Sequence, residues 1–121
     1  DFCIIAADTR LSTGYSILDR NTSKMAKLYA NYNSSSPLIP IRSDKAVLAS
    51  PGMRADQVSL QKMLDLRVKQ YKHEHRKTMS TPSLAQMLSN TLYHKRFFPF
   101  YTFNILGGID ENGEHTIHHQ H

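Results

Sequence analysis

Residues 97–110, FFPFYTFNILGGID, mark the point where this sequence changes from helical to extended structure. Pro99 has no backbone N–H to donate, so a helix that arrives from the N-terminal side is expected to end by this point. Residues 102–106 are rich in aromatic and β-branched side chains and predict a strand. Gly107-Gly108 follow, and Asn112-Gly113 then predict a tight turn, because both residue types tolerate positive φ. We expect a β-hairpin here, cut short because the partner strand has only residues 115–117 before a polar ending.

Two helices are expected before this hairpin. In the first, apolar residues recur on one face at helical spacing, which is typical of a helix packed on a core. This stripe consists of Leu60, Met63, Leu64, Val68 and Tyr71. The second helix is expected to begin at Thr81-Pro82, with Thr81 as the N-cap and Pro82 in the first helical position. Its apolar face consists of Leu84, Met87, Leu88 and Leu92.

Short strands are expected before the helices. Residues 2–7 form a continuous apolar run that ends at Asp8-Thr9-Arg10, and this pattern predicts a buried strand. Further strands are expected within residues 15–18, 25–28 and 46–49. Strands and helices therefore occur in separate runs, which predicts an α+β fold rather than alternating βαβ units. At 121 residues the chain has the length of a single domain.

The formal net charge of +5 derives mainly from residues 62–77, which carry six Lys or Arg against Asp65 and Glu74. A basic helix of this kind could bind nucleic acid, but a solvated helix face is the simpler interpretation. The sequence has neither the Cys/His spacing of a zinc module nor a ribonucleoprotein-type aromatic signature, so we expect no nucleic-acid partner. No apolar run approaches 18 residues, so we expect no membrane partner. The single cysteine, Cys3, predicts a buried thiol in a reducing compartment.

Two segments differ in character from the rest. Residues 29–42, YANYNSSSPLIPIR, contain three consecutive serines and two prolines, which predict a surface loop rather than a helix or central strand. Residues 115–121 contain four histidines and could be imagined as a metal-binding tail. We expect no metal there, since nothing fixes a coordination geometry, and we expect no cofactor elsewhere.

Several motifs together resemble the beta-type subunits of the proteasome. The segment Ile5-Ala6-Ala7-Asp8-Thr9-Arg10 resembles a strand and turn near the start of these subunits. A noncatalytic member in particular is resembled by three further segments: residues 96–101, residues 104–110 and Tyr71-Lys72-His73. The resemblance covers roughly residues 1–28 and 43–114. It implies a four-layer α/β/β/α sandwich of the N-terminal nucleophile hydrolase type, of which residues 1–121 form an incomplete domain. Residues 29–42 are then expected to be an inserted loop and residues 115–121 a divergent tail.

The resemblance also implies a candidate site. In active members of the family the nucleophile is a threonine at the mature N-terminus, activated in part by its own amino group. Asp8 and Lys24 match the aspartate and lysine that assist it. The nucleophile itself is expected several residues before Asp1, while Thr9 and Thr13 are internal and carry no free amino group. We therefore expect no catalytic residue in this chain and a structural role for Asp8 and Lys24.

The resemblance implies a noncatalytic subunit of the core particle's beta ring, with other alpha and beta subunits as partners. Its function would be to enclose the chamber for intracellular protein degradation, ubiquitin-dependent degradation included, in the cytoplasm and nucleus. The alternative is an active threonine-type endopeptidase whose nucleophile lies upstream of residue 1. The residue at that upstream position distinguishes the two readings.

Overall fold

The computed structural model describes residues 4–27 and 46–120. Within these ranges a small antiparallel hairpin, β1 (Leu11–Thr13) and β2 (Ser16–Asp19), precedes an antiparallel four-stranded sheet of order β3-β4-β5-β6. The strands of the sheet and the helices between them are β3 (Met25–Lys27), β4 (Ala46–Ala49), α1 (Arg54–His75), α2 (Thr81–His94), β5 (Asn104–Ile109) and β6 (His115–Gln120). The two helices follow one another in the chain, in agreement with the predicted α+β class.

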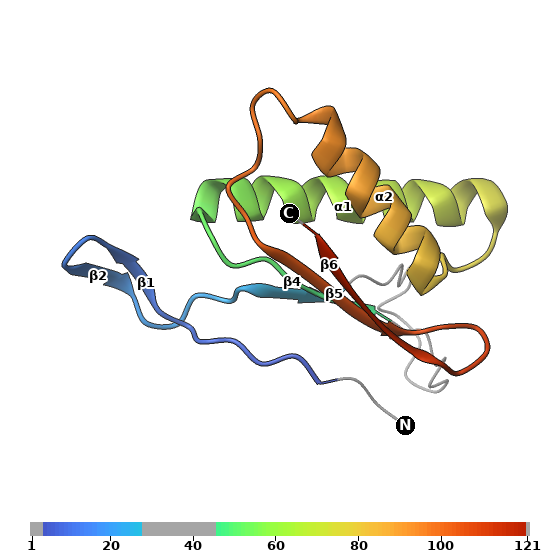
Figure 1. Ribbon diagram of the computed structural model, residues 1–121, viewed down its shortest axis with the longest axis horizontal. Helices are drawn as coiled ribbons and strands as arrows, with labels where there is room; N and C mark the ends of the chain where they lie inside the picture. The colour runs from blue at the N-terminus through green and yellow to red at the C-terminus, as the bar shows by residue number, and fades with distance from the viewer. Residues whose placement is uncertain (1–3, 28–45, 121) are drawn as a thin grey trace.

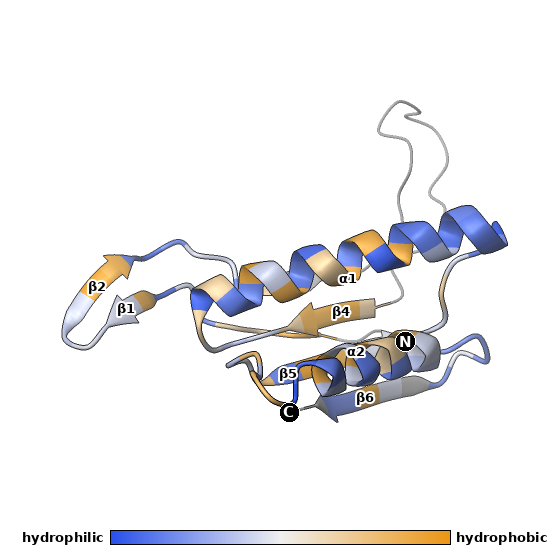
Figure 2. Ribbon diagram, turned by 90° about the horizontal axis from the view of Figure 1, so that it is seen from above, coloured by the Kyte–Doolittle hydropathy of each residue, from blue (hydrophilic) through white to orange (hydrophobic). Residues whose placement is uncertain are grey.

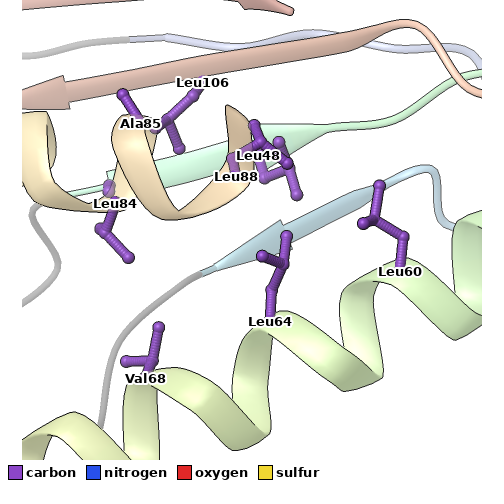
Figure 3. Packing of buried hydrophobic residues seen from close by; sticks show 9 residues of the cluster. Leu48, Leu60, Leu64, Val68, Leu84, Ala85, Leu88 and Leu106 are labelled. Carbon is purple, nitrogen blue, oxygen red and sulfur yellow. The ribbon is translucent and has the colours of Figure 1, made fainter. Parts of the chain in front are cut away.

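Both helices lie on the same side of the four-stranded sheet (Figure 1). The core lies between them and the sheet, and it contains part of each predicted apolar stripe (Figure 3). Met87 and Leu92 pack against it, whereas the predicted Met63 and Tyr71 are half-buried and lie outside it. It consists of Ala46, Leu48, Leu60, Leu64, Val68, Leu84, Ala85, Leu88 and Leu106. Each buried leucine stabilises the fold by roughly 1.5–3 kcal/mol relative to an exposed one. Figure 2 shows hydrophilic and hydrophobic residues alternating along α1, as expected for a helix with one apolar face.

The N-terminus of α2 differs by one residue from the expectation. Ser80, not Thr81, is the N-cap, and its side-chain oxygen accepts a hydrogen bond from the Ser83 N–H. The Thr81 side chain is fully buried, and its hydroxyl donates to the Ile109 carbonyl at 3.0 Å. Thr81 therefore ties α2 to the end of β5, a role that its cap-forming chemistry alone did not indicate.

The terminal hairpin is longer than predicted. β5 continues through Gly107 and Gly108 to Ile109, and β6 pairs with it over six residues, from Ile109↔His115 to Asn104↔Gln120. The two glycines are buried in the sheet rather than forming a turn, because their backbone groups pair with β4 on one side and β6 on the other. The turn predicted at Asn112-Gly113 is confirmed, with Gly113 at φ 80°.

The expectation of a buried strand at residues 2–7 is wrong for the part that the structure describes. Residues 4–7 belong to no strand, and Ile4 is 76% exposed. An apolar run predicts burial only if another layer covers it; here Ala6 and Ala7 are exposed as well, and only Ile5 is half-buried. The four-layer sandwich thus remains a prediction, and so does the divergence of residues 115–121. The predicted loop at residues 29–42 lies outside the described residues.

Candidate functional site

The structure brings Asp8 and Lys24 together. Lys24 Nζ lies 2.7 Å from Asp8 Oδ1 in a hydrogen-bonded ion pair. The aspartate side chain is 67% exposed, whereas the lysine side chain is only 18% exposed. The pair therefore lies at the surface, with its cationic member partly shielded from solvent.

The turn that carries Asp8 is held against the segment that leads to Lys24. The Thr9 hydroxyl donates to the Arg20 carbonyl at 2.7 Å, and the Thr22 N–H donates to the Thr9 carbonyl at 2.9 Å. The second carboxylate oxygen of Asp8, Oδ2, accepts a hydrogen bond from the Arg10 N–H at 3.3 Å. These bonds fix the backbone on both sides of the ion pair.

Lys24 is positioned through the backbone around it. It immediately precedes β3, and its carbonyl accepts from the Ser50 N–H, just after β4, at 3.2 Å. The neighbouring Ser23 carbonyl accepts from Arg54 Nη1 at 2.8 Å, at the start of α1. Gln57, which is 2% exposed, receives a 3.0 Å hydrogen bond from the same Arg54 nitrogen and is itself 3.5 Å from the Ser23 carbonyl. The lysine is thus anchored to both the sheet and a helix.

Asp19 closes the turn between β2 and the Lys24 segment. Its carboxylate accepts from the Thr22 hydroxyl at 2.7 Å and from the Asn21 N–H at 3.0 Å. These hydrogen bonds stabilise the charged carboxylate and lower the pKa of Asp19, the Thr22 hydroxyl having the largest effect. Sequence reasoning did not find Asp19 or Gln57 as parts of the site. For Gln57 a signal existed, since it extends the Leu60 and Leu64 face of α1 by one turn.

The electrostatics of the pair follow from these contacts. The hydrogen bond from Lys24 is the main cause that lowers the pKa of Asp8 below its ordinary value. Asp8 is therefore an anion at neutral pH and is paired with the lysine ammonium. This arrangement can orient the turn and stabilise nearby negative charge, but a protonated lysine cannot accept a proton.

Neither Thr9 nor Thr13 contributes its hydroxyl to the Asp8–Lys24 ion pair. The Thr9 hydroxyl is directed to the Arg20 carbonyl, and Thr13 lies in β1, where it pairs with Ser16. Asp8 also lines an open hollow, together with Arg10 and Arg20. Asp8 and Lys24 are thus a positioned charge pair at an open surface.

The described part of the chain comprises residues 4–27 and 46–120. This part of the chain contains no cluster of three or more His, Cys, Asp or Glu side chains placed to hold a metal ion. None of its helices is both long and apolar enough to cross a membrane.

Comparison with known proteins agrees with the motifs. A family model described as "Proteasome subunit" matches residues 1–120. The chain is 54% identical over 117 residues to Proteasome subunit beta type-1 of Arabidopsis thaliana, covering 97% of this chain and 46% of that protein. Subunits of the same name from Petunia hybrida and Dictyostelium discoideum are 52% and 48% identical, with 97% of this chain and 46% and 44% of each relative covered.

The chain thus spans somewhat less than half the length of these relatives. The resemblance to beta-type subunits, inferred from the sequence motifs, is confirmed by the relatives, and the family model confirms the family. This chain belongs to the proteasome subunit family.

Proposed function

We propose that this protein is a noncatalytic, structural subunit of the beta ring of the proteasome core particle. One observation carries the structural role: Asp8 and Lys24 form an ion pair with each other, with Lys24 Nζ 2.7 Å from Asp8 Oδ1. The Lys24 carbonyl is bound to the Ser50 N–H just after β4, the neighbouring Ser23 carbonyl is bound to Arg54 of α1, and the Thr9 hydroxyl donates to the Arg20 carbonyl. Such a pair holds the turn in place without needing a substrate.

The proposed role sets the partners and the setting. The subunit would pack against other alpha and beta subunits and help to enclose the chamber in which intracellular proteins are degraded, ubiquitin-dependent substrates included. The site of action would be the cytoplasm and nucleus. The similarity to beta type-1 subunits over nearly the whole of this chain supports a place in the core particle.

An active threonine-type endopeptidase is the second candidate. It is favoured by the partial shielding of Lys24, since an ammonium held away from solvent interacts more strongly with a neighbouring nucleophile. In this case a threonine with a free amino group would lie upstream of residue 1 and close to Lys24. The two candidates share the fold and the ring position but differ in peptide-bond hydrolysis.

Co-purification tests the proposed function. The protein carrying this sequence is tagged and produced together with the other core subunits, and native mass spectrometry is applied to the captured material. We expect the tagged protein in a complete core particle at one copy per beta ring. A Leu48→Asp variant, which places a carboxylate in the core, serves as the control that should not assemble. Recovery of the wild-type protein only as a free monomer would contradict the proposal.

A further inference from the structure

Five aromatic side chains are exposed where α2 joins β5. The connection, residues 95–103, leaves the end of α2 and runs past the N-terminal end of α1 to β5 (Figure 1). Phe97 and Phe98 are 86% and 90% exposed. Tyr93, Tyr101 and Phe103 are each at least half exposed as well. Scattered exposed apolar residues are ordinary, but so many large aromatic residues within eleven positions indicate a contact surface.

The connection is held in a defined conformation. Its centre is anchored by Phe100, which is partly buried and packs on the core. Its C-terminal part is bound to the start of α1, because the Met53 N–H donates to the Tyr101 carbonyl at 2.8 Å and Asp56 Oδ2 accepts from the Tyr101 N–H at 2.9 Å. Its N-terminal part forms a turn in which the Phe98 N–H donates to the Lys95 carbonyl at 3.0 Å. A connection whose backbone is already held in this way loses little backbone conformational freedom when it binds.

The charge of the connection is positive. Residues 93–103 include Lys95 and Arg96, both exposed, and no acidic residue. The Arg96 guanidinium lies over the rings of Tyr93 and Phe97, at 4.7 Å and 4.5 Å from their centroids. Stacking of this kind orients the guanidinium and leaves its N–H groups able to bind a carboxylate. Arginine and large aromatic residues are the types most often found at the energetic centres of protein interfaces.

We propose that the aromatic connection, residues 95–103 with Tyr93, is a docking surface for a neighbouring subunit of the core particle. The contacting surface of that subunit has an apolar pocket for Phe97 and Phe98 and a carboxylate that pairs with Arg96. The choice of a subunit as partner rests on the proposed function. The exposed aromatic residues and the positive charge supply the chemistry of the contact.

Incorporation into the core particle is the assay. The tagged protein is produced with the other core subunits, as wild type and as Phe97→Ser/Phe98→Ser, Arg96→Glu and Tyr15→Ser variants. Tyr15 is the matched control, because it is an even more exposed aromatic residue in the turn between β1 and β2. We expect the double variant and Arg96→Glu each to lower the incorporated fraction about tenfold or more. Tyr15→Ser is expected to incorporate like the wild type.

The outcomes distinguish this inference from the function on which it rests. Absence of the wild-type protein from the particle overturns the proposed function and, with it, the assignment of a subunit as partner. If the wild type assembles and the aromatic and Arg96 variants assemble equally well, only the assignment of the aromatic connection as a docking surface is wrong. Pulse proteolysis of each variant checks folding, and Arg96→Glu decides the question if the double variant is unstable. Self-association of the isolated chain that is lost in the double variant would assign the surface to a second copy instead and would overturn the proposal.

Discussion

Replacement of Gly52 by alanine tests how the aromatic connection is anchored. Gly52 has φ of +139°, a conformation that side-chain-bearing residues rarely adopt. A Cβ atom at this position would lie 2.3 Å from the Tyr101 carbonyl oxygen and 2.9 Å from the Thr102 Cα. Both neighbours are backbone atoms, so no side-chain rotation can relieve the overlap. The connection must move away from the start of α1 or Gly52 must change its conformation.

Either movement is destabilising. Strained backbone costs about 1–3 kcal/mol. Two backbone hydrogen bonds flank the contact, from the Met53 N–H to the Tyr101 carbonyl and from the Phe103 N–H to the Pro51 carbonyl, and each contributes about 1 kcal/mol. We therefore expect Gly52→Ala to lower the free energy of unfolding by about 3–5 kcal/mol. The matched control is Gly14→Ala, because Gly14 also has positive φ, at +56°, but nothing lies within 4 Å of its added Cβ. The control is expected to cost about 1–2 kcal/mol.

Pulse proteolysis across a urea series measures both effects at protein concentrations low enough to limit association of open sheet edges. With a urea slope of roughly 1.5 kcal/mol/M, the Gly52→Ala midpoint should fall by about 2–3 M and the control midpoint by about 1 M. Equal midpoints for the two alanine variants would refute the close approach between Gly52 and the connection.

Three further changes test the site and the core. Lys24→Met should raise the pKa of Asp8, which carboxyl NMR shifts measure. In the folded wild type this pKa is lowered from 3.8, so the ion pair stabilises the fold above about pH 4 and ceases to do so as the pH falls through the folded-state pKa. The stability difference between wild type and variant should follow the same pH dependence. A stability difference between variant and wild type that does not change with pH would show that the pair is not formed. Thr81→Val should cost about 1–2 kcal/mol in urea unfolding, since it leaves a β5 carbonyl without its donor; no change would contradict that hydrogen bond. Leu48→Ala should cost about 2–5 kcal/mol, against less than about 0.5 kcal/mol for the exposed Leu66→Ala, and similar costs would refute the position of the core.

Local pattern was sufficient for the helices and the core. Leu60, Leu64 and Val68 recur at helical spacing, and all three lie in the core. The first residue of α2 was predicted one position off, because Ser80 and Thr81 have nearly equal capping chemistry and only the fold decides which side chain turns toward β5. Residues 4–7 show the opposite limit, since burial of an apolar run depends on what covers it rather than on the run itself.

The candidate site could be located only in part. Asp8 and Lys24 are sixteen residues apart, and no spacing rule joins such positions; the resemblance to beta-type subunits supplied the pairing, and the structure supplied its 2.7 Å distance. The anchoring by Arg54 and Gln57 depends on how α1 packs beside the strand that follows Ser23. Contacts of this kind join segments about thirty residues apart, and the order of residues alone does not determine them.

The absence of catalysis is the central claim, and covalent labelling tests it most directly. Purified core particles that contain the tagged protein are treated with an electrophile that reacts with both the hydroxyl and the amino group of an N-terminal threonine, and the intact mass of each subunit is then measured. The account predicts that this subunit keeps its unmodified mass while other beta subunits in the same particle gain the label. A stoichiometric adduct on this subunit would contradict it.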